Sequence, residues 1–203
     1  MRLGLFGGTF APPHLGHVRA AERYLDAVKP DKLIIMPTGI PPHKIKAKGD
    51  TPDARLEMCH AAFDQLENTE VSDYEIKKGG VSYSYLTLEH LTEPGREIDL
   101  LCGSDMFLTL SYWMRAEDIF RLARIVAFSR GTEDFRVLAE KQKEYETQYG
   151  ARILLLDAEP FPVSSSLIRE KIAGGEDLSG LLTEDVIRII ERENLYGKEN
   201  ENA

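Results

Sequence analysis

Residues 7–17 read Gly-Gly-Thr-Phe-Ala-Pro-Pro-His-Leu-Gly-His, and the fold of the chain is decided around this stretch. Residues 2–6, directly before it, form a short apolar run that is typical of a buried strand. Residues 18–28, directly after it, carry apolar side chains at helical spacing. The stretch is therefore expected to form a tight glycine turn between a strand and a helix, where an α/β sheet offers backbone N–H groups and a helix N-terminus to an anion.

Two histidines, His14 and His17, stand three residues apart in this stretch, with Gly16 between them. They permit a zinc site, although two ligands are too few and the helical HExxH pattern has a spacing of i, i+4. They also permit two structural histidines beside a turn. We favour a phosphate site, because positions i and i+3 share one helix face and imidazole N–H groups can donate to a phosphate that gains charge during a reaction. Gly16 would then leave room for the phosphate to approach the backbone.

Apolar runs alternate with helical patterns along the rest of the chain, which predicts an α/β fold with a Rossmann-like parallel sheet flanked by helices on both faces. Strands are expected at residues 32–36, 71–76, 98–102, 124–128 and 152–156. Helices are expected at residues 52–66, 82–91 with Ser82 as the cap, 107–122 in two pieces, 135–149, from 164 to the glycines at 174–175, and 183–194. The 203 residues fit one domain, with a C-terminal helical part at about 164–197 and a polar tail at 198–203.

Composition argues against two classes of protein, nucleic-acid-binding proteins and membrane proteins. The net charge of −9 and the pI near 5.1 disfavour a general nucleic-acid-binding protein, which usually shows a basic face. No apolar run approaches the roughly 18 residues of a membrane span and no signal peptide is evident, so we expect a cytoplasmic protein without membrane partners. Cys59 and Cys102 match no metal or redox motif. We interpret Met58, Cys59 and Met106 as core residues, and the oligomeric state stays open, a homo-oligomer included.

Three consecutive serines precede a Leu-Ile-Arg sequence at residues 164–169. Serine is a preferred helix cap, but a helix needs only one cap residue. We therefore expect a second helix N-terminus whose hydroxyls and N–H groups hold phosphate. Arg169 would fold back toward that N-terminus as a planar group with several donors.

These two stretches resemble the two signatures of the nucleotidylyltransferase superfamily. Residues 7–17 resemble its HxGH motif, in the GGTFxPxHxGH form typical of nicotinate mononucleotide adenylyltransferases, although the family often has Asp where this chain has Ala11. Residues 163–169 resemble its ISSTxIR motif, with Val163 and Ser166 in place of Ile and Thr. The resemblance spans nearly the whole chain and implies a fold of the nucleotidylyltransferase type.

The resemblance also implies an activity: transfer of the AMP moiety of ATP to nicotinate mononucleotide, which gives nicotinate adenine dinucleotide (deamido-NAD) and pyrophosphate in NAD biosynthesis. His14, His17 and Arg169 would then be catalytic. Mg²⁺ would be carried with ATP, because no dedicated protein metal site is evident. Nicotinamide mononucleotide adenylyltransferase and phosphopantetheine adenylyltransferase are the alternative activities, and a nucleotide-binding regulator without catalysis is an alternative of another class.

Further segments match the narrower family and complete two sets of candidate binding residues. Residues 37–44 resemble its substrate loop, residues 80–84 its G-x-S-Y-T segment at the nicotinate end, and residues 103–105 its G-A-D segment near the adenosine. The candidates for binding ATP are Gly7, Gly8, Thr9, Phe10, His17, Gly103, Asp105, Ser164, Ser165 and Arg169. The candidates for binding the second substrate are Thr38, Lys44, Tyr83, Ser84, Trp113 and Arg130.

Three of these candidates have simpler alternatives. The family implies that Trp113 packs on the pyridine ring, but a single tryptophan could instead be a core residue. Asp105 could cap a helix instead of lying near the adenosine. Arg130 could be a turn residue instead of a phosphate contact.

Overall fold

In the computed structural model, residues 1–41, 49–129, 132–157 and 163–197 are described. Within these ranges the chain forms a six-stranded sheet with the order β3-β2-β1-β4-β5-β6, and every neighbouring pair of strands is parallel. The strands are β1 (Arg2–Gly8), β2 (Lys32–Pro37), β3 (Thr69–Val71), β4 (Glu97–Gly103), β5 (Arg124–Ser129) and β6 (Ile153–Asp157). The strand order reverses between β1 and β4, so the predicted Rossmann-like parallel sheet is confirmed.

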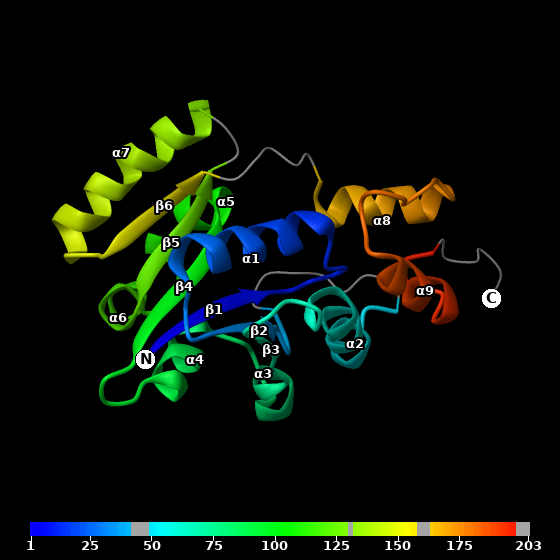
Figure 1. Cartoon of the computed structure of the whole chain (residues 1–203), viewed down its shortest axis with the longest axis horizontal. Helices are drawn as coiled ribbons and strands as arrows, with labels where there is room; N and C mark the ends of the chain where they lie inside the picture. Colours follow the sequence, from blue (N-terminus) through cyan, green and yellow to red (C-terminus); the bar gives the residue numbers. More distant parts are fainter. Residues whose placement is uncertain (42–48, 130–131, 158–162, 198–203) are drawn as a thin grey trace.

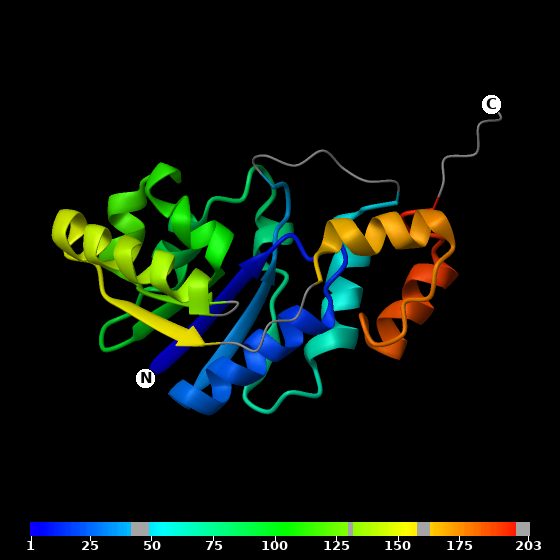
Figure 2. The same ribbon diagram turned by 90° about the horizontal axis from the view of Figure 1, so that it is seen from above.

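Helices cover both faces of this sheet (Figures 1 and 2). One core cluster joins the strands to α1 (Leu15–Val28), α2 (Pro52–Phe63), α8 (Ser165–Gly174) and α9 (Glu184–Arg192). The other cluster joins them to α4 (Ser84–Leu91), α5 (Ser104–Leu108), α6 (Ala116–Leu122) and α7 (Thr132–Tyr149). Successive strand residues point to opposite faces, so in β1 Leu5 enters the second cluster and Phe6 the first.

The strand that we predicted at residues 71–76 is wrong. Only Thr69–Val71 pairs with β2, and the short helix α3 (Tyr74–Lys78) follows. The cause is local: the Ser72 hydroxyl accepts the Tyr74 N–H at 3.3 Å, and Lys77 pairs with Asp73 one helical turn away at 2.7 Å. Such bonds from Ser and Asp side chains favour a turn over a continued strand.

Two smaller predictions are also wrong. Ser82 is not a helix cap, because α4 begins only at Ser84 and Tyr83 is its N-cap residue. Met106 is not a core residue, because it is 46% exposed, whereas Met58 and Cys59 are buried. The helical region predicted at 107–122 begins earlier, at Ser104, and a short 3-10 helix, η1 (Leu110–Tyr112), lies between α5 and α6.

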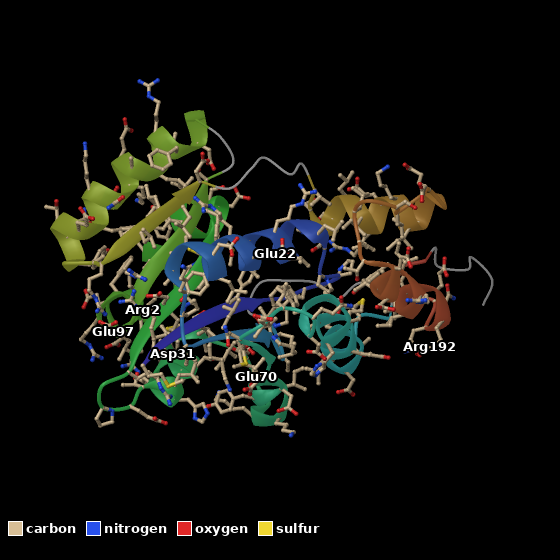
Figure 3. The ribbon with its side chains drawn as sticks, in the orientation of Figure 1. Arg2, Glu22, Asp31, Glu70, Glu97 and Arg192 are labelled. Carbon is tan, nitrogen blue, oxygen red and sulfur yellow. The ribbon has the colours of Figure 1, made fainter. Side chains whose placement is uncertain are left out.

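Charged and polar side chains fix the amino end of the sheet. Arg2 pairs with Glu97 across β1 and β4 at 2.7 Å, and the Arg2 N–H donates to the Asp31 carboxylate at 2.6 Å (Figure 3). Deeper in the fold, the Tyr24 hydroxyl donates to the buried Asp99 carboxylate at 2.9 Å. Arg124 donates to both oxygens of the same carboxylate, at 2.8 and 2.6 Å. These bonds tie α1 to β4 and β5 at a distance from the strand ends that carry the candidate site.

The close packing of Tyr24 over β1 generates a stability prediction. A Cβ atom on Gly4 would lie 2.5 Å from the Tyr24 ring, which its bond to Asp99 holds in place, and 2.9 Å from Leu33. Gly4→Ala should therefore lower the free energy of unfolding by about 1–3 kcal/mol. Urea denaturation measures this, with Gly7→Ala as the matched control, because a Cβ there meets nothing within 4 Å. Equal losses in the two variants would contradict the steric explanation.

Candidate active site

Residues 7–17 lie at the carboxyl edge of the sheet, where the strand order reverses and where open α/β sheets place their ligands. β1 ends at Gly8, and the Gly8 carbonyl accepts both the N–H and the hydroxyl of Thr38, at 2.9 and 2.8 Å. This pair of bonds joins the end of β1 to the end of β2. α1 then starts at Leu15, with His14 as its N-cap residue. The predicted order of strand, turn and helix is confirmed.

The two histidines stack on each other at the start of α1. Their ring centroids are 3.6 Å apart, and the His14 N–H donates to Nδ1 of His17 at 3.1 Å. Because Nδ1 accepts this bond, the proton of a neutral His17 ring sits on Nε2, which is then a hydrogen-bond donor. The His17 ring also packs on Phe10, with centroids 5.0 Å apart. The orientation of His17 is thus fixed by a backbone bond and by aromatic contacts.

Phe10 shapes the turn through its side chain. It has a φ of 49°, uncommon for a residue other than glycine, and its side chain is 2% exposed. The ring packs against Phe6 and Phe63 as well as His17. A candidate contact of Phe10 with ATP is therefore limited to its backbone. The neighbouring Gly7 is exposed, and a Cβ atom added there would meet no atom within 4 Å, so this position is open to a ligand.

The second predicted phosphate stretch lies directly against the first. Ser164 caps α8 by accepting the Leu167 N–H, and the Ser165 hydroxyl donates to the carbonyl of Pro12 at 2.9 Å. Arg169 donates from one Nη to the carbonyl of Ala11 at 2.8 Å and from the other to the Ser166 hydroxyl at 3.1 Å. The loop at Ala11, where the family often has Asp, is therefore held from outside by α8. The structure thus brings together the two stretches that we predicted separately as phosphate sites.

Gly16 lies in a closely packed part of the turn. A Cβ atom there would lie 3.0 Å from both His14 Nδ1 and a methyl group of Val163. The space that a side chain at position 16 would need is thus filled by the protein. Gly16 lets Val163 and the start of α8 pack against His14.

Arg55 is a component of the site that the sequence analysis missed. Its side chain, on α2, is 3% exposed and makes an ion pair with Asp50 at 2.8 Å. It donates to three carbonyl oxygens at the strand ends: Thr9 at 3.0 Å, Thr38 at 2.5 Å and Gly39 at 3.0 Å. Its position one turn before Met58 and Cys59, on the apolar face of the helix, was the available signal in the sequence.

The segment predicted to receive the second substrate lies beside the end of β2. The Gly39 N–H donates to the Ser82 hydroxyl at 3.0 Å, and Ile40 pairs with Val81 as an isolated bridge. Tyr83 and Ser84 follow directly, at the start of α4. Thr38, Tyr83 and Ser84 thus belong to one group of neighbouring segments, whereas Lys44 and Arg130 lie outside the described residues.

Comparison with known proteins agrees with this arrangement. Residues 5–171 match the model of the cytidylyltransferase-like family. A Clostridium tetani protein named "Probable nicotinate-nucleotide adenylyltransferase" is 38% identical over 95% of this chain and 97% of its own length. A Clostridium botulinum protein of the same name is 37% identical over 98% and 99%. The chain belongs to the nicotinate-nucleotide adenylyltransferase family.

Solved structures show the same fold. A nicotinic acid mononucleotide adenylyltransferase from Plasmodium falciparum, complexed with APC, superimposes with a TM-score of 0.73 at 14% identity over 96% of each chain. A putative nicotinate-nucleotide adenylyltransferase from Vibrio parahaemolyticus gives a TM-score of 0.65 at 20% identity, over 94% of this chain and 98% of its own. At these identities the likeness extends to the fold alone, which is the predicted nucleotidylyltransferase type.

The remaining candidates from the family resemblance lie at the end of β4 and beyond. Gly103 ends β4 and is the N-cap residue of α5, so Asp105, in the first turn, is not the cap that we considered as its alternative role. Asp105 is exposed. Trp113 follows η1, is half-buried, and packs against the core cluster of α4 to α7, so it is partly a core residue.

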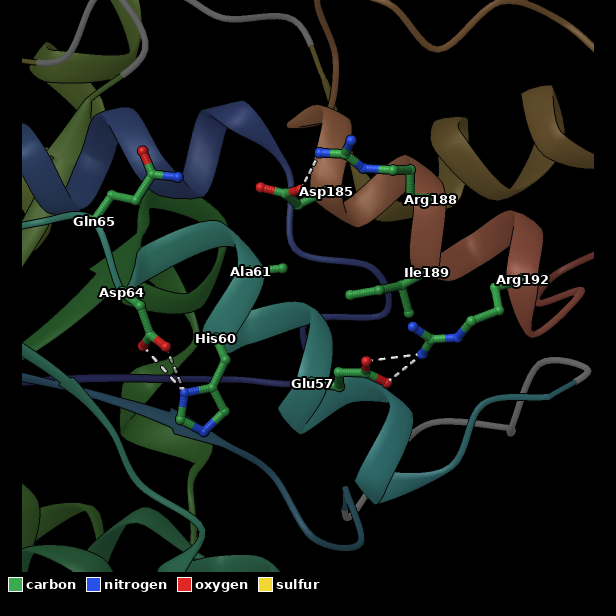
Figure 4. Close-up of a pocket in the computed structure, with 9 residues that line it drawn as sticks. All are labelled: Glu57, His60, Ala61, Asp64, Gln65, Asp185, Arg188, Ile189 and Arg192. Carbon is green, nitrogen blue, oxygen red and sulfur yellow. Dashed lines mark hydrogen bonds and ion pairs between the residues drawn. The ribbon is translucent and has the colours of Figure 1, made fainter.

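The hollow between α2 and α9 is a different feature from this site (Figure 4). Its charged side chains pair with one another: Glu57 with Arg192 at 2.7 Å, His60 with Asp64 at 3.0 Å, and Asp185 with Arg188. Among the described residues, the members of the candidate site do not line it. With its charges matched in pairs, the hollow offers no evident cradle for a polyanion.

Glu75, also missed from the sequence, generates a prediction on pH. Burial raises the pKa of its carboxyl, and hydrogen bonds from Thr87 and Ser82, with the charges of Lys78 and Arg55, oppose that rise. The pKa of the Glu75 carboxyl is therefore higher in the folded chain than in the unfolded chain, where it is about 4.3. The free energy of unfolding then falls as the pH rises from the unfolded-state pKa through the folded-state pKa. Glu75→Gln cannot titrate, so its deficit in unfolding free energy relative to the wild type should shrink with rising pH. Urea denaturation across this range measures it, and a deficit that grows with pH would contradict the assignment.

Proposed function

We propose that this chain transfers the AMP moiety of ATP to nicotinate mononucleotide, giving nicotinate adenine dinucleotide and pyrophosphate in NAD biosynthesis. The main support is the contact of Ser165 and Arg169 with the carbonyls of Pro12 and Ala11, directly before the stacked histidines. This contact gathers the imidazoles, hydroxyls and guanidinium that a triphosphate and a second, phosphate-bearing substrate require. The names of the full-length relatives support nicotinate mononucleotide as the acceptor.

The chemistry fits the residues that are present. The attacking group is the phosphate of the mononucleotide, whose second pKa is about 6, so it is largely deprotonated at neutral pH and needs no general base. One of its oxygens forms a bond to the α-phosphorus of ATP, and the bond from that phosphorus to the bridging oxygen of the β-phosphate breaks. Catalysis is then positioning together with stabilisation of the charge that develops on the phosphates.

The proposed roles of the phosphate-binding residues follow from their positions. His14 and His17, with the backbone N–H groups of Thr9 and Phe10 and the glycine pair Gly7 and Gly8, bind the reacting phosphates. The Nε2–H of His17 is suited to this role because its Nδ1 accepts the His14 N–H. On the facing element, Ser164, Ser165 and Arg169 hold the β- and γ-phosphates as pyrophosphate leaves.

The remaining candidates take the organic parts of the substrates. Thr38, Tyr83 and Ser84 surround the mononucleotide near the end of β2, and Trp113 packs on its pyridine ring. Gly103 and Asp105 lie near the adenosine. Lys44 and Arg130, which fall outside the described ranges, stay candidates for contacts with substrate phosphate. We also propose that the whole chain acts as one domain, since α8 and α9 share a core cluster with β1 and α1.

Mg²⁺ enters this proposal as part of the substrate MgATP. Within the residues that the structure describes, no group of three or more His, Cys, Asp or Glu side chains could hold a metal ion. We therefore assign the ion to the phosphates of ATP and derive no step through a protein-bound metal.

The decisive assay is pyrophosphate release with MgATP, run in parallel on nicotinate mononucleotide, nicotinamide mononucleotide and phosphopantetheine. We expect a clear preference for nicotinate mononucleotide. A preference for nicotinamide mononucleotide would keep the mechanism but change the acceptor. A preference for phosphopantetheine would also keep adenylyl transfer, but to an acceptor that is not a nucleotide. ATP binding without turnover on any acceptor would overturn the enzymatic function in favour of a nucleotide-binding regulator.

The two phosphate groups of residues can be tested separately from the choice of acceptor. His17→Ala and Arg169→Ala should each lower kcat by about 10²–10³-fold, because each removes a donor aimed at developing phosphate charge. Arg169→Lys should recover little activity, since a lysine lacks the planar fork.

Matched controls are available on the α2 and α9 surface. His60→Ala and Arg188→Ala remove the same side-chain types from exposed ion pairs and should leave kcat unchanged. Thermal unfolding of all five variants separates catalysis from stability. A loss of activity in His17→Ala or Arg169→Ala that only follows a loss of melting temperature would contradict the proposed roles.

A further inference from the structure

We propose that Glu75 is a positioning residue for the acceptor-binding end of the site, where it fixes the Ser82–Ser84 segment through its bonds to Ser82 and Thr87. This inference rests on the proposed function, because it takes that segment as the place that receives the pyridine part of the mononucleotide. Glu75 itself is not proposed to touch the substrate. It acts by holding the Ser82–Ser84 segment, which is proposed to contact the substrate.

The first observation is a buried carboxyl group that stability alone does not explain. Glu75 is 9% exposed, although it belongs to a helix of only five residues near the edge of the sheet. Burying a carboxylate is costly unless its oxygens are hydrogen-bonded, and an apolar side chain would fill the same space without that cost. Its Oε1 accepts the Thr87 hydroxyl at 2.6 Å, and the Ser82 hydroxyl is close enough to the same carboxyl group to lower its pKa by hydrogen bonding.

The second observation is where these two hydroxyls lie. Ser82 stands directly before the candidate substrate residues Tyr83 and Ser84, and Thr87 stands one helical turn after them in α4. The carboxyl group thus holds the candidate segment from both sides. The charges that bear on it come from Lys78 on its own helix and from Arg55 on α2.

The third observation is the direction of the hydrogen bonds. In its charged form a carboxylate only accepts, so both hydroxyls must donate to it. The Ser82 hydroxyl has one proton, and its oxygen is then left to accept the Gly39 N–H, which lies 3.0 Å away. A glutamine at this position offers one acceptor oxygen and one NH₂ donor group, so one of the two hydroxyls would have to accept from it and turn its own proton elsewhere.

The packing between α3 and the end of β2 is also close enough that a small shift of one segment moves the other. A Cβ atom on Gly39 would lie 2.6 Å from the Glu75 carbonyl oxygen, so α3 packs directly on the end of β2. The Ser82 N–H donates to the Ile40 carbonyl at 2.9 Å, next to the Ile40–Val81 bridge. A shift of Ser82 therefore moves the Thr38–Ile40 end and the Tyr83–Ser84 start together.

The test is the split between the KM values of the two substrates in the full-length chain. Glu75→Gln should raise KM for nicotinate mononucleotide about tenfold and leave KM for ATP within about twofold. Ser82→Ala, a milder change in case Glu75→Gln does not fold, should raise the same KM because Gly39 loses its acceptor. The double variant should be no worse than the single ones, because both break one chain of bonds.

Tyr24→Phe is the matched control. Like Ser82→Ala it removes a hydroxyl bonded to a buried carboxylate, but this carboxylate is Asp99, away from the candidate site. It should lower the melting temperature and leave both KM values unchanged. Equal rises of both KM values in Glu75→Gln, or additive effects in the double variant, would overturn the inference.

The outcome is distinguishable from a failure of the proposed function. If the wild-type chain prefers another acceptor, the proposed function fails, and the same KM split is measured on that acceptor. An unchanged KM for the acceptor in Glu75→Gln overturns the inference whichever acceptor the wild type uses. A wild-type chain that turns over no acceptor overturns both.

Discussion

The loop between β1 and α1 is held by its carbonyl oxygens, and the geometry of the candidate site depends on this constraint. Arg55 donates to the carbonyl of Thr9, and Arg169 donates to the carbonyl of Ala11. In a trans peptide the C=O and the following N–H point in opposite directions, so the Arg55 bond turns the N–H of Phe10 away from the guanidinium. An anion-binding loop needs N–H groups directed at its ligand, and the Arg55 guanidinium behind the loop imposes that direction on the N–H of Phe10.

Arg55 also explains why α2 can carry a charged side chain on its apolar face. A buried guanidinium requires partners in several directions, and here they are the Asp50 carboxylate and the carbonyls of Thr9, Thr38 and Gly39. Lysine could not meet this set of acceptors, because it lacks the fixed planar arrangement of five donors. Since an apolar residue would pack in the core without desolvation, the shape of the site accounts for Arg55 better than the stability of the helix does.

Local features of the fold were predictable from the sequence, and features that depend on distant contacts were less so. An apolar run, two glycines and a helical pattern determine the turn after β1 within a few residues. The alternation at residues 71–76 was misleading, because the Ser72 hydroxyl starts a helical turn that no periodicity reveals. The residue types of the two stretches were enough to predict a helix N-terminus in each, but the contact between them became visible only in the structure. Arg55 and Glu75 stayed hidden, because only packing against remote segments decides whether a charged helical residue is buried.

The two ends of the candidate site are joined through one dipeptide, Thr38–Gly39. The Thr38 N–H donates to Gly8 and the Gly39 N–H to Ser82, while both of their carbonyls accept from Arg55. Every backbone N–H and C=O of this dipeptide is therefore hydrogen-bonded. One N–H bonds to Gly8 at the end of β1, and the other bonds to Ser82, which lies beside Glu75. Such a segment has little freedom to adapt to a ligand. Recognition at this edge must then come from a backbone that is already in position, which is the form of binding that favours catalysis by positioning and fixed dipoles.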